Sequence, residues 1–133
     1  SYSDGLDIDF SDISIDLLKV KNAKNDCVDL SKGSYILGKV FLSNCGDKAI
    51  SIGEQSVFSA NLVSINHSNI GIASKDSSIS KISKSDIKNS EICVDAYQKK
   101  QEFFGSVILI DQLNCNSFSI RNDKNSKVYL NEL

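Results

Sequence analysis

Apolar residues alternate with polar ones in short blocks that return about every 22 residues along the chain. In each block the second and fourth positions are mostly aliphatic, and residues two apart lie on the same face of a strand. The pattern therefore predicts short strands with one apolar face. The blocks begin at Gly5, Cys27, Ala49, Gly71 and Cys93, and a sixth begins at Ser117 after a spacing two residues longer than the others. The two apolar columns read Leu6, Val28, Ile50, Ile72, Val94, Phe118 and Ile8, Leu30, Ile52, Ser74, Ala96, Ile120.

A fixed period of this size is typical of a solenoid, in which each unit buries its apolar side against its neighbours. Two further apolar stretches follow the first in each repeat, at residues 35–37 and 40–42 in the second repeat. We therefore expect an all-β protein of five to six coils, with three strands and about 22 residues per coil. We expect residues 1–133 to form one domain, excised from or flanked by a larger chain, because it begins at Ser1 without an initiator methionine.

Asparagines mark the polar turns between repeats. Asn22, Asn44 and Asn66 are separated from one another by one period each, and Asn89 follows one position late. Three strands per coil with an asparagine column at a corner resemble the right-handed parallel β-helix of the pectate-lyase-like superfamily, over about residues 5–125. The resemblance implies an internal asparagine ladder, with side chains hydrogen-bonded along the axis. A helical solenoid is the alternative, and the β-branched columns disfavour it.

The four cysteines are expected to be free and mostly buried. Cys27 and Cys93 share a column three coils apart, which separates them by roughly 14 Å at the ordinary spacing of strands. Cys45 and Cys115 are also about three coils apart, whereas a disulfide requires Cα atoms within about 7 Å of each other. No cysteine or histidine spacing indicates a zinc site.

Two extra residues are required to restore the period at Ser117. We place them within residues 98–102, with the turn at residues 113–116 as the alternative. Insertions in solenoids form loops on one face, which is often the binding face. A tolerated bulge is the competing interpretation.

Charged residues of both signs converge on one corner of consecutive coils, close to an aromatic residue. Glu54 and Asp76 lie one period apart there, so their carboxylates are expected to repel unless a cation neutralises them. One interpretation is a charge-balanced ladder that supports the corner. The other is a polar groove for a sugar chain or a metal, with a candidate ligand site formed by Glu54, Lys75, Asp76, Tyr97, Lys99 and Lys100.

The outward column of the first strand reads Asp7, Asp29, Ser51, Ala73, Asp95. In the enzymes that the chain resembles, carboxylates on such a face bind calcium and a lysine or arginine abstracts a proton. Asp95 and Lys75 are expected to lie near each other, but the dense carboxylate cluster is missing. The single arginine, Arg121, is expected to lie away from them in the last repeat. We therefore name no catalytic residue, no metal ligand and no cofactor, and we expect His67 to lie on the surface.

Charge and hydropathy narrow the classes of partner. The net charge of −2 and a pI near 5.3 give no positive field for nucleic acid, and no apolar run approaches the ~20 residues of a membrane span. We expect a non-catalytic β-helix module of an extracellular, cell-surface or phage protein, which binds glycan or spaces other domains. The alternatives are a polysaccharide lyase or epimerase fragment acting on an acidic glycan, and an element that self-assembles through its open coil ends.

Overall fold

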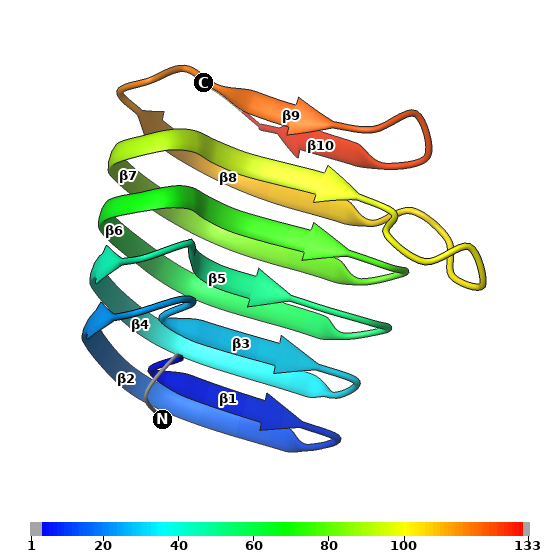
Figure 1. Cartoon of the computed structure of the whole chain (residues 1–133), viewed down its shortest axis with the longest axis horizontal. Coiled ribbons are helices and arrows are strands. Elements are labelled where there is room, and N and C mark those ends of the chain that lie inside the picture. Colours follow the sequence, from blue (N-terminus) through cyan, green and yellow to red (C-terminus); the bar gives the residue numbers. More distant parts are fainter. Residues whose placement is uncertain (1–3, 132–133) are drawn as a thin grey trace.

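A computed structural model describes residues 4–131 as a parallel β-solenoid of about six turns (Figure 1). One sheet of ten strands winds around the core, and all of its strand pairs are parallel. The described residues contain no helix, and so none that could serve as a membrane span. The strands are β1 (Leu6–Asp9), β2 (Asp12–Ala23), β3 (Val28–Ser31), β4 (Ser34–Cys45), β5 (Lys48–Ile52), β6 (Val57–Lys75), β7 (Ile79–Tyr97), β8 (Val107–Cys115), β9 (Ile120–Asn122) and β10 (Lys127–Leu130).

The predicted apolar column is confirmed by the register of the first wall of the solenoid. This first-strand wall consists of β1, β3, β5, the last parts of β6 and β7, and β9. Its pairs join Leu6 to Val28, Val28 to Ile50, Ile50 to Ile72, and Ile72 to Val94, each one period apart. The last four side chains are fully buried. The period therefore reflects stacking of aliphatic side chains directly on one another, which buries apolar surface and stabilises the fold.

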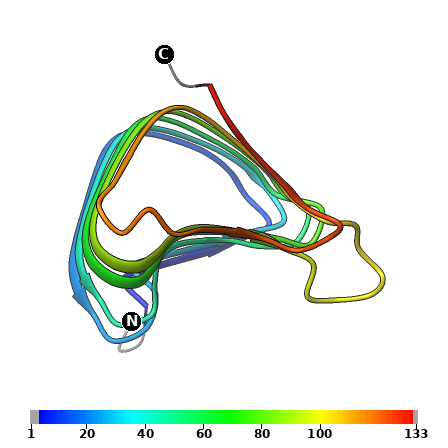
Figure 2. The ribbon, with the colours of Figure 1, turned by 90° about the horizontal axis from the view of Figure 1, so that it is seen from above.

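The predicted register of the last coil is wrong by two residues. Val94 pairs with Ile120 rather than Phe118, and the Phe118 side chain is 89% exposed in the preceding turn. Ser80 pairs with Ile108, so the loop at residues 98–106 contains six residues more than the period requires. The turn after Cys115 is two residues short. The loop is where we placed the insertion but is larger than predicted, and it projects beyond the other coils in Figure 2.

The predicted asparagine column is also displaced by one residue. Ser34 pairs with Val57, at a spacing one residue longer than the period, so His67 rather than Asn66 reaches the corner position. Asn22, Asn44, His67 and Asn89 share a left-handed backbone there, with φ between 53° and 72°. The side-chain amide of Asn44 donates to Asn22 at 3.0 Å, and that of Asn89 donates to Asn66 at 2.8 Å. These residues are exposed, so this partial ladder lies on the surface and not inside the solenoid.

The expectation of four free thiols is wrong, because the cysteines form two disulfides. Cys27 bonds to Cys45, with Cα atoms 5.3 Å apart, and Cys93 bonds to Cys115, with Cα atoms 6.2 Å apart. Neither bond runs down a column. Each crosses a corner, where the chain has nearly completed a turn and residues 18 or 22 apart in sequence meet again. The two bonds are compatible with an oxidising compartment.

Candidate functional site

The predicted site residues occupy the corner that follows the first-strand wall, here called the loop corner, and the adjoining end of the wall. At the corner, the Lys100 ammonium pairs with the Glu54 carboxylate, and Lys32 reaches the same group at 3.5 Å. The hydrogen bond from Lys100 lowers the pKa of Glu54, and the charge of Lys32 adds to the effect. Glu54 therefore links the second and third coils to the inserted loop.

The Asp76 carboxylate binds the backbone of the inserted loop. Its side chain is 0% exposed, and its Oδ1 accepts hydrogen bonds from the backbone N–H groups of Lys99 at 2.7 Å and Lys100 at 2.9 Å. Its Oδ2 has no hydrogen-bond partner among the described residues. Glu54 and Asp76 thus each have separate cationic or N–H partners, and Asp76 is out of reach of a large ligand.

Further hydrogen bonds fix residues 98–106 against neighbouring coils. The Gln98 N–H donates to Asp123 Oδ2 at 2.7 Å, and the Asn125 amide donates to Gln98 Oε1 at 2.7 Å. The Phe104 N–H donates to Ser77 Oγ at 2.7 Å. The loop is therefore an ordered part of the corner, held by polar contacts to the coils on both sides.

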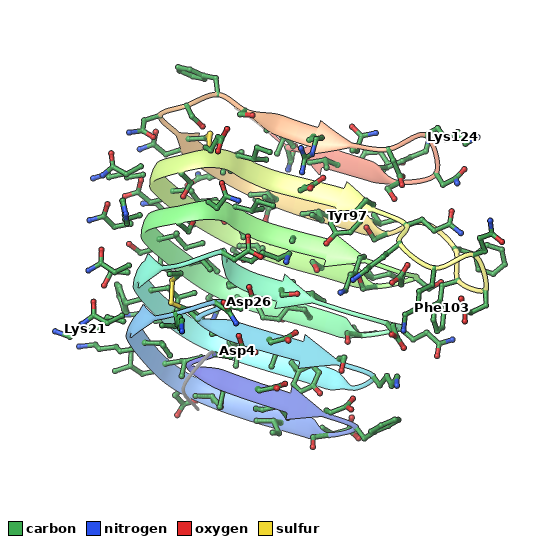
Figure 3. All side chains as sticks on the ribbon, viewed as in Figure 1. Asp4, Lys21, Asp26, Tyr97, Phe103 and Lys124 are labelled. Carbon is green, nitrogen blue, oxygen red and sulfur yellow. A yellow bond between two sulfur atoms is a disulfide. The ribbon has the colours of Figure 1, made fainter. Side chains whose placement is uncertain are left out.

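Lys75 and Tyr97 lie on the outward face of the first-strand wall, where they are paired neighbours on adjacent strands. The aliphatic stem of Lys75 lies over Gly53. A Cβ atom placed on this glycine would be 3.5 Å from Lys75 Cε, which is van der Waals contact. Burial lowers the pKa of Lys75, and the nearby charge of Lys99 lowers it further against the opposing charge of Asp29. Burial likewise raises the pKa of Tyr97. The two side chains are thus half-buried on this face of the wall (Figure 3 labels Tyr97).

A pocket of about 320 Å³ opens beside Tyr97. Arg121 Nη2 donates to Asp95 Oδ2 at 2.6 Å, and the Asp95 side chain is only 5% exposed. The expectation that Arg121 is remote from Asp95 is wrong, because the corrected register pairs the two residues directly. Burial opposes the charged form of Asp123, but hydrogen bonds from Gln98, Ser126 and Asn125 lower its pKa. The wall pocket is lined by Ile70, Asp95, Tyr97, Arg121, Asn122 and Asp123.

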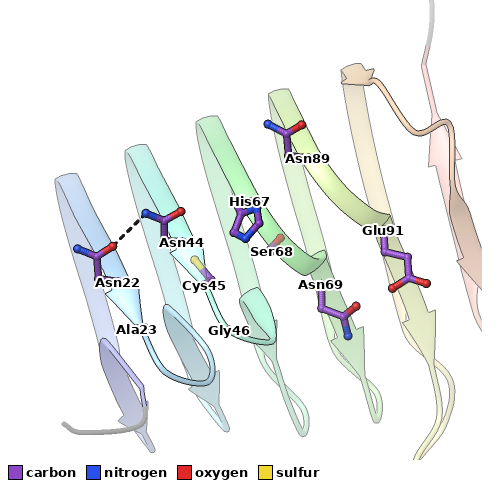
Figure 4. Close-up of a pocket in the computed structure, with 10 residues that line it drawn as sticks. All are labelled: Asn22, Ala23, Asn44, Cys45, Gly46, His67, Ser68, Asn69, Asn89 and Glu91. Atoms are coloured by element: carbon purple, nitrogen blue, oxygen red, sulfur yellow. Dashed lines mark hydrogen bonds between the residues drawn. The ribbon is translucent and has the colours of Figure 1, made fainter.

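A second concave region, the amide groove, lies at the opposite corner and has a volume of about 660 Å³ (Figure 4). It follows the turns of consecutive coils just before the first-strand wall, and side-chain amides dominate its polar lining. The exposed position of His67 in this groove confirms the prediction that it is a surface residue. The lining residues are Asn22, Ala23, Asn44, Cys45, Gly46, His67, Ser68, Asn69, Asn89 and Glu91.

Acidic side chains gather at the N-terminal end of the wall. One carboxylate oxygen from each of Asp4, Asp7 and Asp29 lies within 4.8 Å of the others, a spacing that a divalent cation could bridge. Burial raises the pKa of Asp29 to about 6, and the charges of Asp26 and Asp7 contribute to the rise. The outward column alone does not reveal this cluster, because Asp4 lies outside that column.

Comparisons with models of protein families, with curated proteins and with solved structures find no significant match to this chain. The fold and the surface geometry are therefore the basis for the functional proposal.

Proposed function

We propose that this protein is a non-catalytic β-solenoid module that binds a neutral glycan in the wall pocket beside Tyr97. The observation that carries the proposal is the combination of a part-exposed aromatic ring with fixed, paired polar groups in one shallow pocket. A sugar offers apolar C–H faces and a ring of hydroxyl groups, so it fits an aromatic surface bordered by oriented donors and acceptors. Asp95 and Arg121 hold each other in place, which provides such orientation.

The charge of the pocket favours a neutral ligand. The lining contains one arginine and two aspartates, so its net charge is negative and disfavours a carboxylate or sulfate. The lowered pKa of Asp123 favours its ionised form, and an ionised carboxylate cannot donate a proton to a leaving oxygen. These features support binding without turnover.

A lyase acting on an acidic glycan is the second candidate, and the lowered pKa of Lys75 favours it, because a general base is most effective when its pKa approaches the working pH. Against this, Asp95 pairs with Arg121 rather than with Lys75. Incubation with a panel of acidic polysaccharides tests the alternative. Release of unsaturated products with ultraviolet absorbance, abolished in Lys75→Ala, would replace our proposal with this one.

The parallel, regularly stacked coils also support the resemblance to pectate-lyase-like β-helices, which we retain as part of the proposal. The two disulfides support an extracellular or cell-surface location, where such bonds persist. A spacer role without any ligand is the remaining form of a non-catalytic module.

A glycan array followed by calorimetry on the best neutral oligosaccharide tests the binding proposal. We expect Tyr97→Ala to weaken binding at least about ten-fold, as loss of a central aromatic contact typically does. Tyr129→Ala is the matched control, because Tyr129 is half-exposed and belongs to β10, outside the pocket. Equal effects of the two variants, or no neutral glycan bound by the unaltered protein, would leave only the spacer role.

A further inference from the structure

Among the described residues, the inward side chains of the first coil are covered by a neighbouring coil on one side only. In the second coil the six inward apolar residues are at most 3% exposed, whereas their counterparts in the first coil are only partly buried. Among the described strands, β1 pairs only with β3 and β2 pairs only with β4, so each keeps one unpaired backbone edge. Such an edge is a template for another strand. The six first-coil residues are Leu6, Ile8, Ile13, Ile15, Leu18 and Val20.

The last coil ends in the same way. β9 pairs only with β7 and β10 pairs only with β8 among the described strands, which leaves a second free edge. Ile120 is 38% exposed, and Val128 and Leu130 are partly buried against the core below them. Both ends of the solenoid therefore present apolar side chains together with unpaired strand edges, and Figure 1 shows them at opposite ends of the axis.

The two ends have opposite charge. Residues 4–26 contain six aspartates against three lysines, Lys19, Lys21 and Lys24. Residues 107–131 contain Arg121, Lys124 and Lys127 against the two acids Asp111 and Asp123. Figure 3 labels Asp4 and Lys124 at these opposite ends. The carboxylates of Asp7 and Asp29 lie close together, and their repulsion adds to burial, the main cause, in raising the pKa of Asp29. A cationic surface placed beside them would relieve it.

Columns of the first two walls also continue from one end to the other, whereas the column of Leu18 ends at Leu113 of β8. The strand pairs place Leu6 and Ile120 in one inward column, and Ile13 and Val128 in another. If a second copy added its first coil as the next turn, these apolar residues would stack in pairs. The same register would place Asp7 next to Arg121, and Asp12 next to Lys127.

We propose that two copies of this protein associate head to tail, with the acidic first coil of one copy stacked as the next parallel turn on the basic last coil of the other. β9 and β10 are only 3 and 4 residues long, so the shared edge is short and the association is expected to depend on concentration. The contact is heterologous and does not close, which allows further copies to add at either end. This inference does not depend on glycan binding.

Sedimentation over a range of protein concentrations tests the proposal, with charge reversals at the Asp12–Lys127 contact. We expect Asp12→Lys and Lys127→Asp each to weaken association about five- to ten-fold, because each brings two like charges together. A mixture of the two variants restores complementary contacts at both junctions, so it should associate like the unaltered protein. The double variant should do the same.

Asp12→Asn is the control for folding, because the Asp12 side chain accepts a hydrogen bond from the Ser34 N–H at 3.2 Å and asparagine keeps that acceptor. Its melting curve should match the unaltered protein. Strictly monomeric behaviour at every concentration would overturn the proposal. So would self-association that is unchanged by either charge reversal, since that would indicate another surface. Glycan binding in the wall pocket is measured separately through Tyr97→Ala, so the two proposals can fail independently.

Discussion

Two corners of the solenoid flank the first-strand wall, and they are held by different kinds of bond. The corner that precedes the wall, here called the cysteine corner, is closed by Cys27–Cys45 and Cys93–Cys115. The loop corner is closed by the ion pair of Glu54 with Lys100 and by the backbone hydrogen bonds to Asp76. A local group of charged residues can therefore support a turn as well as bind a ligand. The disulfides of the cysteine corner are insensitive to salt and pH, whereas the polar contacts of the loop corner respond to both.

Removal of the disulfides should have the largest effect. Closing a loop of 18 or 22 residues constrains the unfolded chain, so each paired Cys→Ala variant should lose about 3 kcal/mol of unfolding free energy. Urea unfolding with and without reductant measures this loss. Thiol titration of the denatured, unreduced protein should find no free thiol among the four cysteines. Four titratable thiols would restore the original sequence expectation.

Asp76→Ala tests the polar corner and should cost about 2–3 kcal/mol, because it removes a charged acceptor from two backbone N–H groups. Asp76→Asn keeps one acceptor oxygen and should cost less. Hydrogen exchange at the Lys99 and Lys100 amides gives a local measure, and both amides should exchange faster in the alanine variant. Unchanged exchange would show that the loop is held by its other contacts.

Asp29 lies on the wall between the corners and should destabilise the fold at neutral pH. Its folded pKa of about 6 exceeds the ordinary value of 3.8, so the folded state binds this proton more tightly than the unfolded state. The associated penalty is present above pH 6 and disappears as the pH falls toward 4. Asp29→Asn should raise unfolding free energy at pH 7 by about 1–2 kcal/mol and flatten this part of the pH profile. A loss of stability in this variant would mean that a bound cation uses the carboxylate.

Glu54→Gln should have the smallest effect, close to the detection limit of a melting curve, because part-exposed ion pairs contribute little. The lowered pKa of Glu54 gives the sign: its contribution is present above the unfolded pKa and is lost as the pH falls through the folded one. Melting curves at low and high salt provide the check. A large, salt-independent loss would place Glu54 with Asp76 as a structural anchor.

The period of the apolar columns was sufficient to predict the solenoid, because Val28, Ile50, Ile72 and Val94 stack without any insertion between them. Corner lengths are not constrained in this way. Relative to the period, the chain has one extra residue before Val57 and one residue fewer before Ile70. These changes leave the strand pattern unchanged, but they place His67 where Asn66 was expected. The size of the inserted loop cannot be read from the period either. The pairing of Asp95 with Arg121 was therefore not predicted. The disulfides were missed because only residues in one column were compared.

The direction of the hydrogen bonds has a mechanical consequence. They run along the solenoid axis, so tension applied to the two ends would load them one coil at a time and unwind the chain from its ends. Each freed coil would release roughly 75 Å of extended chain, far more than its height in the stack. The Cys27–Cys45 bond would withhold the 18-residue span that it closes, and Cys93–Cys115 would withhold another of 22. Under oxidising conditions the two bonds thus act as stops that limit extension, and a reductant would lengthen the same molecule under the same force.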